Sequence, residues 1–376
     1  MLIIRNCNFI VENKRFYLFV SIKTCIFAPT LKQIQWQQKN KLMIMIKQVM
    51  KSPFSGGNAV LRCEPSTLTF RKEEFCYIHQ FYECEDTHER FSTTELDEAN
   101  IAQVYNQYRA KYGIPFPEEI KRIRQHYGLS ATKMSAILGF GENQYRLYEN
   151  GDMPSEANGK VLMSIMNPDF FLAFVLNSRE QFSEEEFAKL MEKTRSWKSK
   201  KHSDFEVEHV FNSCRRTIFN GFATQSIDKL KNILLYFIER GDGVFFTKMN
   251  KLLFYTDFLA YRMTGKGMTG LCYKAIAHGP VPLHWDRVYS FYNEISQEIV
   301  QYADGRAGTK LVSNLSPDMT YFSADEKEML EYVYQRFKKE TPTQISETSH
   351  QEDAWKKYLN SDRLISFEMA FSLKAI

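Results

Sequence analysis

The sequence of 376 residues lacks the compact spacings that mark common catalytic and metal sites. Its seven cysteines form no Cys-x-x-Cys pair, and this odd, scattered set favours reduced thiols in the cytoplasm over a disulfide framework. The sequence has no P-loop for nucleotide phosphates, no Gly-x-Ser-x-Gly nucleophile elbow and no His-Glu-x-x-His zinc motif. These absences argue against the common hydrolase and metalloprotease classes, and we expect a cytoplasmic protein without a cofactor.

The first fifty residues differ from the rest of the chain. Their longest apolar run, residues 16–27, is too short to span a bilayer and is interrupted by Lys23. They carry eight Lys or Arg and one acid, a surplus of seven, and since the whole chain has net charge +4 the remainder stands at −3. The basic isoelectric point is therefore no evidence for nucleic-acid affinity. We interpret residues 1–50 as a disordered leader, or as sequence upstream of a translation start at residues 43–50, and we expect no membrane association.

Residues 51–94 have the pattern of a small β unit. Apolar residues alternate at Leu68 and Phe70 and again over residues 75–81, and turns are expected at 55–57 and 64–66. With 44% hydrophobic and 25% charged residues, the whole chain has the composition of an ordinary globular protein. Residues 95–112 carry apolar residues at helical spacing and predict a helix.

The β unit also has the layout of a zinc ribbon that has lost its metal. Ser52-Pro-Phe-Ser55 stands where a zinc knuckle would carry Cys-x-x-Cys, and serine hydroxyls do not replace thiolates on zinc. Four other residues have the types of zinc ligands, but three of them fall in one strand-like run whose side chains alternate between faces. This set is Cys76, His79, Cys84 and His88. We therefore predict a β core with buried thiols and no metal.

Residues 115–155 carry the strongest functional pattern. Apolar residues recur at helical spacing up to Tyr127, and Gly128 is expected to end this helix. Ser130 is placed as the N-cap of a second short helix, and a third helix is expected at 142–149 after a glycine-containing turn. Two short helices joined by such a turn, the second rich in Asn, Gln, Tyr and Arg, are typical of a DNA-binding helix-turn-helix.

The third helix would present its polar side chains to base edges. Asn143 and Gln144 can pair with adenine, and Arg146 with guanine or a phosphate. Ser130 and Lys133 are placed for phosphates, which position a protein on DNA. The predicted DNA-binding set is Ser130, Lys133, Asn143, Gln144, Arg146 and Tyr145, of which Tyr145 is also expected to pack the helix. The alternative is a small helical bundle without a DNA-binding role.

The second half of the chain predicts a separate helical domain. A polar, basic stretch at 195–204 reads as a linker or hinge. Helices are expected at 227–239, 248–263, 283–300, 322–339, 344–359 and 364–373, with a strand or hairpin at 271–276 and a rigid turn at 278–282.

An acid on one of these helices raises the question of catalysis. Asp257, together with His278 and Cys272, could suggest hydrolytic chemistry. An acid on a mostly apolar helix more often anchors a nearby turn through hydrogen bonds. We interpret Asp257 in that way and predict that the protein is not an enzyme.

Two blocks of the sequence resemble known families. Residues 51–160, with FSTTELDEANIAQVYNQYR at 91–109 and the helical segment at 113–155, resemble the zinc-ribbon and helix-turn-helix module of MqsA/YgiT-like antitoxins. Residues from about 224 onward resemble the Panacea, or SocA-like, domain. The matching stretches there are KMNKLLFYTDFLAYRMTGKGMTGLCYKAIAHGPVP at 248–282, SHQEDAW at 349–355 and ISFEMAF at 365–371.

The resemblance implies an antitoxin of a bacterial or phage toxin–antitoxin system. It implies a C-terminal domain that neutralises a cognate toxin by direct contact, and a helix-turn-helix that binds the operator DNA of the operon. Asn143 matches the base-reading Asn of MqsA-like proteins, whereas Leu147 occupies the place of the Arg, with Arg146 one residue earlier. The toxin-facing candidates are Tyr255, Asp257, Tyr261, His278 and Trp285.

Other readings remain open at this point. They are a transcriptional regulator without a toxin partner, and a proteolytic adaptor that delivers a toxin to a protease. A homodimer is expected only because helix-turn-helix proteins commonly read two half-sites.

The predicted fold class is mainly α, of the α+β type. It combines a small N-terminal β unit, a helix-turn-helix bundle and a helical domain with a short β hairpin. The expected segments are a leader at 1–50, the β unit at 51–94, the helix-turn-helix domain at 95–180, a linker and connecting helix at 181–223, and the Panacea-like domain at 224–376.

Overall fold

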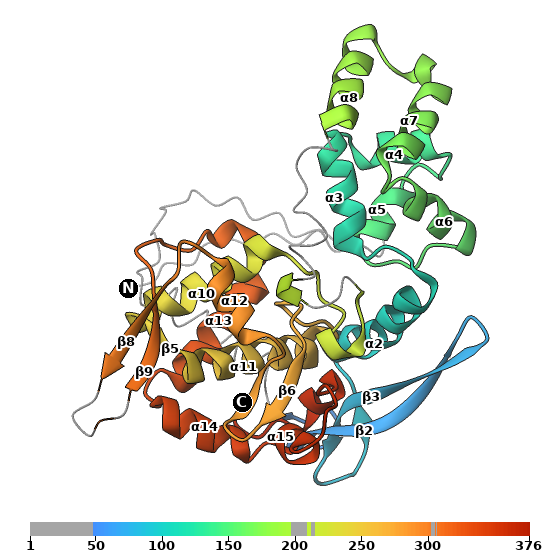
Figure 1. The fold of residues 1–376 in the computed structure, drawn as a ribbon. Coiled ribbons are helices and arrows are strands. Elements are labelled where there is room, and N and C mark those ends of the chain that lie inside the picture. Colours follow the sequence, from blue (N-terminus) through green and yellow to red (C-terminus); the bar gives the residue numbers. More distant parts are fainter. Residues whose placement is uncertain (1–47, 197–208, 212–214, 302–304, 306) are drawn as a thin grey trace, which may run out of the picture. The chain divides into compact units, whose positions relative to one another are not determined.

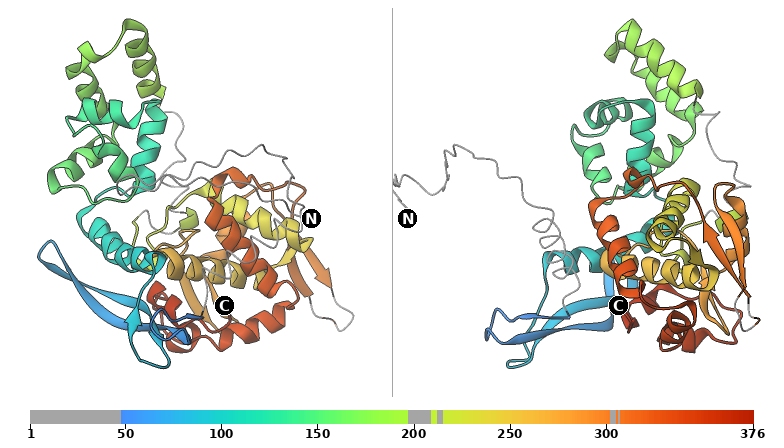
Figure 2. Two further views of the ribbon diagram at one scale, coloured as in Figure 1. Left: turned by 180° about the vertical axis from the view of Figure 1, so that it is seen from behind. Right: turned by 90° about the vertical axis from the view of Figure 1, so that its left-hand side faces the viewer.

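The computed structural model describes residues 48–196, 209–211, 215–301, 305 and 307–376, all within one compact unit, Leu42–Ile376 (Figures 1 and 2). The predictions for residues 1–47 and for most of the linker lie outside the described residues. The described part is mainly helical with small antiparallel sheets, so the predicted α+β class is confirmed. No single helix among the described residues is long and apolar enough to cross a membrane. Only the helix pair α6 (Glu156–Ser164) and α7 (Pro168–Asn177) passes by length and composition, and it is bent by 109°.

The β unit is a four-stranded antiparallel sheet with the order β1-β2-β3-β4. Its strands are β1 (Val49–Lys51), β2 (Asn58–Phe70), β3 (Glu73–Cys84) and β4 (Arg90–Phe91). The predicted turn at 64–66 is wrong, because β2 runs straight through it. The turn lies instead at Arg71 and Lys72, both with positive φ, 50° and 69°. Two residues of this conformation form the type of hairpin connection whose twist matches that of the flanking strands.

Pro65 fits inside β2 because of where its missing N–H would point. Its neighbour on β3 is Ile78, whose backbone N–H and C=O are both bonded to the side chain of Gln103, on the side away from β2. Pro65 and Ile78 therefore form a pair without ladder hydrogen bonds between them. Since β1 pairs with β2 only as far as Val60, the nitrogen of Pro65 faces an open edge, where a proline is tolerated.

Helix α2 (Thr94–Tyr112) covers the outer edge of β3 with side-chain amides. Asn100 accepts from the backbone N–H of Gln80 and donates to its carbonyl, both at 2.9 Å, and Gln103 does the same with Ile78 at 3.1 and 2.9 Å. Gln107 adds one bond to a carbonyl further along the same edge. Three amides at helical spacing thus bond backbone groups that a neighbouring strand would otherwise pair.

The next helices form a bundle with its own apolar core. They are α3 (Pro117–Tyr127), α4 (Ala131–Leu138), α5 (Gln144–Glu149), α6 (Glu156–Ser164), α7 (Pro168–Asn177), η1 (Arg179–Gln181) and α8 (Glu184–Ser196). The predicted end at Gly128 is confirmed by a left-handed φ of 67°, and α4 ends at Gly139, in the predicted glycine-containing turn, with φ 70°. The side chain of Ser130 caps α4 as predicted, and Ser183 with Glu186 forms a capping box at the start of α8. The third helix begins at Gln144, two residues later than predicted.

The C-terminal part surrounds α11, whose side chains are buried from Met249 to Arg262. Helices α13 and α14, strand β7 and η5 pack against it. The elements here are η3 (Ile218–Asn220), α10 (Ile227–Gly241), β5 (Val244–Phe245), α11 (Phe246–Thr264), β6 (Tyr273–Ile276), β7 (Gly279–Pro282), α12 (Trp285–Phe291), β8 (Ser296–Gln301), β9 (Ala307–Val312), η4 (Met319–Tyr321), α13 (Ala324–Phe337), α14 (Pro342–His350), α15 (Asp353–Tyr358) and η5 (Phe367–Ser372).

Four predictions about this part are wrong in detail. The rigid turn expected at 278–282 is mostly the strand β7. The helix expected at 283–300 is the short helix α12 followed by the strand β8, and β8 pairs with β9 in the sheet β5-β9-β8. The helix expected at 344–359 is two helices, α14 and α15, and the last one is the 3₁₀ segment η5.

Candidate functional site

Asp257 lies on α11 and fixes the loop that follows the helix. The side chain is fully buried. Its Oδ1 accepts from the backbone N–H groups of Met268 at 2.7 Å and Thr269 at 2.6 Å, and its Oδ2 accepts from the hydroxyls of Thr269 and Tyr273, the latter at 2.6 Å. Burial raises the pKa of Asp257, and these four hydrogen bonds act in the opposite direction. The predicted role as a turn anchor is confirmed, and its candidacy as a toxin contact is wrong because no atom reaches the surface.

Two other toxin-contact candidates are also core residues. Tyr255 stacks on Phe337 with ring centroids 4.5 Å apart, and its hydroxyl donates to Glu352 Oε1 at 3.1 Å. Tyr261 packs edge-on against Phe367 at 5.6 Å. Tyr255 is fully buried and Tyr261 is 1% exposed. Their prediction as toxin contacts is therefore wrong, because both side chains pack in the core.

Glu352, from the SHQEDAW stretch, ties the end of the chain to this core. It is 1% exposed and accepts from the backbone N–H groups of Lys374 at 2.9 Å and Ala375 at 3.0 Å. From α11, the guanidinium of Arg262 donates two bonds to the backbone oxygen of Ile376, both at 3.1 Å. Most of the polar residues in the family-like stretches therefore build the frame and do not themselves offer a surface.

A buried lysine supports the hairpin formed by β6 and β7. Lys251 on α11 has no exposed surface, and its Nζ donates to the carbonyl of Pro280 at 3.0 Å. A Cβ at Gly279, which has φ +100°, would lie 2.5 Å from Cε of Lys251, so only glycine allows this approach. Burial lowers the pKa of Lys251 to about 7. The sequence analysis missed Lys251; its only signal was the apolar sequence on both sides of a charged residue.

The remaining two candidates, His278 and Trp285, are accessible. His278 is exposed at the turn of the β6–β7 hairpin, and its carbonyl accepts from Ser346 Oγ at 2.7 Å. Trp285, at the start of α12, is half-buried against Phe246 and Tyr289, with ring centroids 5.6 and 6.2 Å away. These two are the predicted toxin-facing residues that a partner could reach.

The hydrolytic reading finds little support in this geometry. Burial raises the pKa of Cys272 to about 11, which keeps the thiol protonated near neutral pH. The carboxylate of Asp257 already has its four bonds within the loop. Among the described residues, no group of three His, Cys, Asp or Glu side chains is placed to hold a metal ion.

Four residues of the β unit meet where a zinc ribbon would hold its metal. Ser52 and Ser55 precede β2, Cys84 ends β3 and Thr87 follows it, so both pairs have the spacing of Cys-x-x-Cys. Hydrogen bonds from the hydroxyls of Ser52, Ser55 and Thr87 lower the pKa of the buried Cys84 to about 6, with Ser55 Oγ 3.3 Å from Cys84 Sγ. One sulfur and three hydroxyl oxygens do not form the thiolate and imidazole set that zinc prefers. Hydrogen bonds hold these two turns together.

The bundle of α3, α4 and α5 is fixed by one ion pair and one buried tyrosine. Arg124 on α3 donates to both carboxylate oxygens of Glu149 on α5, at 2.5 and 3.0 Å. Tyr145 is fully buried, its hydroxyl donates to the carbonyl of Ile120 at 2.8 Å, and its N–H donates to Ser135 Oγ at 3.1 Å. The assignment of Tyr145 to the DNA-contact set is therefore wrong, while its expected packing role is confirmed.

The other predicted DNA contacts differ in exposure. Asn143 and Arg146 are exposed and Gln144 is half-buried, all at or near the start of α5. The Ser130 hydroxyl accepts from the N–H of Lys133 at 3.1 Å, as a cap. The ammonium of Lys133 already bonds a carbonyl of the η1 segment and lies 4.4 Å from the centroid of the Phe182 ring.

Partly buried charges join the start of α3 to the C-terminal part. Glu118 Oε1 accepts from Arg216 at 2.7 Å and from Thr224 Oγ1 at 2.9 Å, and lies 3.2 Å from Lys266 Nζ. Burial alone would raise the pKa of this carboxyl, but the charges of Lys266 and Arg216 hold it well below its usual range. Arg216 also pairs with Glu119 at 2.8 Å. A cavity of about 880 Å³ lies beside this cluster.

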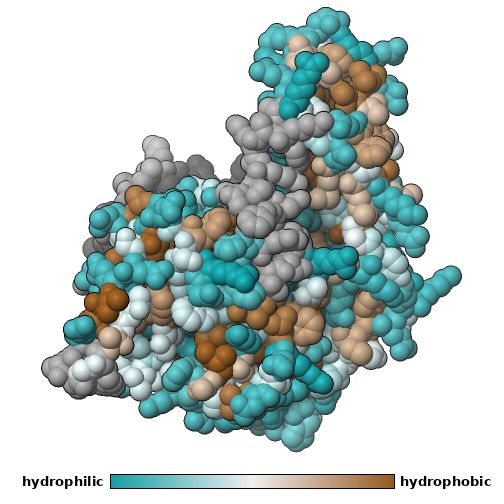
Figure 3. Space-filling view, in the orientation of Figure 1, coloured by the Kyte–Doolittle hydropathy of each residue, from teal (hydrophilic) through white to brown (hydrophobic). Residues whose placement is uncertain are grey.

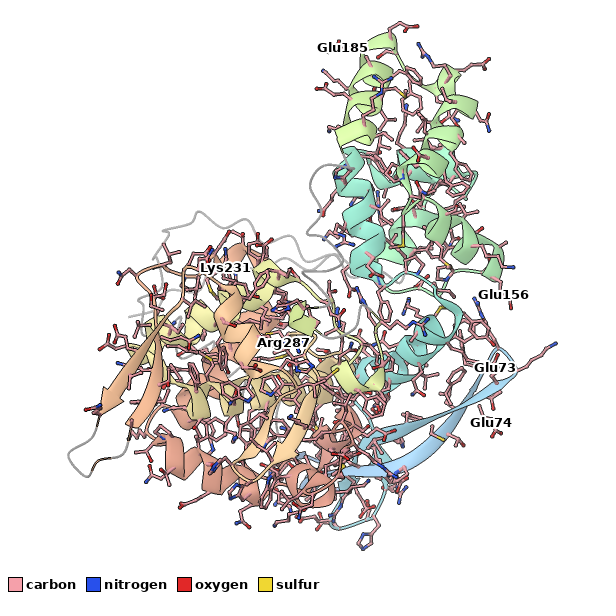
Figure 4. All side chains as sticks on the ribbon, in the orientation of Figure 1. Glu73, Glu74, Glu156, Glu185, Lys231 and Arg287 are labelled. Carbon is pink, nitrogen blue, oxygen red and sulfur yellow. The ribbon has the colours of Figure 1, made fainter. Side chains whose placement is uncertain are left out.

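Helix α2 also holds the chain that leaves α5. Arg109 is 3% exposed and donates to the carbonyls of Gly151 at 2.7 Å and Asp152 at 3.2 Å. Near the β2–β3 turn, Arg71 donates to the carbonyl of Pro154 at 2.6 Å. At the same turn, Glu73 accepts bonds from two residues at the end of α2 (Figure 4). The start of α3 and the end of α5 are thus both bonded to neighbouring parts of the chain.

One family model matches the chain. Residues 249–356 match the family described as "Antitoxin SocA-like, Panacea domain". This match begins in α11 and ends in α15, so it contains the hairpin β6–β7, α12, α13 and α14. No curated protein and no solved structure matches the chain. The resemblance of the N-terminal half to MqsA-like antitoxins has no support from these comparisons.

Proposed function

We propose that this protein is a cytoplasmic antitoxin whose C-terminal domain neutralises a cognate toxin by direct binding. The observation that carries the proposal is the match of residues 249–356 to the SocA-like antitoxin family. The geometry supports binding over catalysis: its acids and its lysine are committed to loops and turns, as Asp257 and Lys251 illustrate. The family match implies that the partner is a toxin, but it does not say which toxin.

The toxin-binding surface centres on the β6–β7 hairpin and the start of α12. His278 and Trp285 are the accessible candidates there, and the backbone beneath them is well supported. Trp355 Nε1 donates to the carbonyl of Ile276 at 2.7 Å, and Lys251 donates to that of Pro280. The Trp285 ring is held against Phe246 and Tyr289, and an aromatic side chain that is already ordered loses little entropy on binding.

The bundle of α3, α4 and α5 serves as a DNA-binding arm that represses the operon. Support comes from the exposure of Asn143 and Arg146 beside a core fixed by Tyr145 and the Arg124–Glu149 pair. Side chains placed in this way can enter a major groove, while the bundle keeps its shape.

Co-purification with the product of the adjacent gene tests the neutralisation. The tagged full chain is expected to retain that product at a 1:1 or other fixed ratio, and His278→Glu is expected to weaken the complex at least tenfold. Glu185→Ala, an exposed change on α8, is the matched control and should retain the partner. A product that elutes separately from the wild-type chain would refute the proposal.

A further inference from the structure

The cavity of about 880 Å³ lies between α2, the start of α3 and the segment that precedes α10. Its wall contains apolar and aromatic side chains, among them Phe116, Ile218 and Phe222. Ala110 and Lys111 also line it and are exposed, so the cavity is open to solvent. Protein pockets that hold small organic molecules measure about 300–1,000 Å³ and combine an apolar wall with a few polar groups.

Arg109 on α2 lines this cavity and has no anionic partner. The residue is 3% exposed, and its Nη2 donates to the carbonyls of Gly151 and Asp152. Of the described residues, none accepts a hydrogen bond from its Nε or Nη1, and no carboxylate forms an ion pair with it. Burial lowers the pKa of Arg109 to about 10. Buried charges in proteins are normally paired, because a charge without a partner loses its hydration and gains nothing in return.

Two other largely buried arginines do have anionic partners. Arg216 is bound by Glu118 and Glu119, at 2.7 and 2.8 Å. Arg124 is bound by both carboxylate oxygens of a glutamate on α5. Arg109 differs from both, and it is the one that meets a large open cavity without a carboxylate of its own. The contrast indicates that the partner of Arg109 is an anion from outside the chain.

The charge of the lining also favours an anion. Four cationic side chains line the cavity against two carboxylates, Glu119 and Glu368, of which Glu119 is already bound to Arg216. The cations are Arg109, Lys111, Arg215 and Arg216. Lys111 and Arg216 have carboxylate partners of their own, so the charge of Arg109 is the one left to be compensated.

We propose that this cavity binds a small organic anion, a phosphate or carboxylate group on a flat apolar body, with the anionic group bound to Arg109. A guanidinium suits both groups, because its planar N–H donors match their oxygens and it remains charged. The two bonds of Nη2 hold the guanidinium in place, and Nη1 is left for the ligand. Tyr77, Phe116 and Phe222 supply aromatic surface for the flat body.

Equilibrium dialysis of the full chain against three probes tests this chemistry. Naphthyl phosphate and naphthoate carry the two anionic groups on one flat body, and naphthol is the uncharged analogue. At least one anion is expected to bind saturably and at least tenfold more tightly than naphthol, and the tighter anion identifies the preferred group. The matching anion without a ring, inorganic phosphate or acetate, should bind at least tenfold more weakly.

Three results would overturn the proposal. They are the absence of saturable binding of either aromatic anion, equally tight binding of naphthol, and equally tight binding of the anion without a ring. The second result would mean that the cavity is only an apolar pocket, and the third that the aromatic wall takes no part.

Two variants locate the site. Arg109→Gln removes the charge and keeps an amide donor for the neighbouring carbonyls, and it should weaken binding of the tighter anion at least tenfold. Ala110→Trp, at an exposed residue of the lining, places an indole in the cavity and should weaken binding as much with Arg109 intact. Ala188→Trp, at an exposed alanine of α8 outside the lining, is the matched control and should bind as wild type does.

Wild-type affinity in Ala110→Trp, or in a folded Arg109→Gln, would contradict this site. If Arg109→Gln does not fold, Ala110→Trp decides alone. Neither His278 nor Trp285 lines the cavity, and the measurements contain no toxin and no DNA, so a failure here leaves the proposed function standing.

Discussion

The two larger apolar cores among the described residues differ in where their polar residues lie. In the core around α11, acids and bases such as Asp257, Lys251 and Glu352 are buried and bound to backbone groups. In the bundle of α3 to α8, the core is apolar apart from a few hydroxyls, and the polar side chains stand at the surface, as Asn143 and Arg146 do. Figure 3 shows that apolar side chains also reach the surface in this helical part.

This difference shows that a sequence stretch typical of a family can contain mostly residues with a structural role. The buried polar residues of the family-like stretches fix loops, so we assign the proposed toxin-binding surface to exposed positions such as His278. In the bundle Glu149 of α5 is held in an ion pair with Arg124, whereas the side chain of Arg146 is exposed. Substitutions should therefore affect stability in the first region and binding in the second.

The largest expected effect is that of Asp257→Ala on stability. The change leaves two backbone N–H groups and two hydroxyls without their acceptor in a buried site, which should cost roughly 3–5 kcal/mol of unfolding free energy. Urea denaturation followed by circular dichroism measures it. Glu185→Ala, an exposed acid on α8 (Figure 4), should leave the midpoint unchanged. Similar midpoints for the two variants would contradict the claim that acids in the α11 core stabilise the fold more than acids on the bundle surface.

The second effect is a pH dependence caused by Lys251. Its folded-state pKa of about 7 lies below the ordinary 10.5, so between these values the unfolded chain binds more protons and stability rises with pH. From pH 7 to pH 10 the gain is about 3–4 kcal/mol. Lys251→Met should remove that share of the slope and raise stability at pH 7. Parallel stability curves for wild type and Lys251→Met would show that the lysine titrates normally.

Such features mark the limit of sequence reasoning. Helix ends at Gly128 and Gly139, the Ser130 cap and the Asp257 anchor could be predicted, because each depends on a local rule. The burial of Lys251 could not, since a lysine is exposed by default and only the packed fold places it beneath a hairpin.

The errors about strands have a similar cause. Val288, Tyr292 and Ile295 recur at helical spacing up to Ile299 and predicted one helix, but pairing with β9 makes the last part a strand. Pro65 predicted a turn, and it lies in β2 because the strand has no neighbour on that side. In both cases the secondary structure depends on pairing between strands, which cannot be read from a single sequence.

The third effect concerns the contact between α2 and the end of α11. Gly265 has φ +67°, and a Cβ there would lie 2.9 Å from Cβ of Ala102 and 3.0 Å from the backbone nitrogen of Gln103. Gly265→Ala should cost about 2–3 kcal/mol. Gly139→Ala is the matched control, with φ +70° but open space around it, and should cost about 1 kcal/mol. Thermal unfolding measures both losses of stability. Equal losses would mean that α2 does not pack closely against Gly265.

The smallest effect on stability, and a clear one on binding, is expected in α5. Arg146→Ala and Asn143→Ala should each weaken binding to the promoter of the operon by about 1–3 kcal/mol, because each removes a base contact that we propose. Their unfolding midpoints should match wild type, since both residues are exposed. Gel shifts at a fixed salt concentration measure the affinity. Unchanged affinity in both variants would refute the assignment of α5 as the recognition helix.

Growth of cells that express the adjacent gene tests the central claim most directly. The account predicts that this gene alone arrests growth, and that co-expression of the full chain restores it. Arg146→Ala should restore growth as well as wild type does, because neutralisation resides in the C-terminal domain. An adjacent gene that is harmless when expressed alone, or rescue by wild type that is lost with Arg146→Ala, would contradict the account.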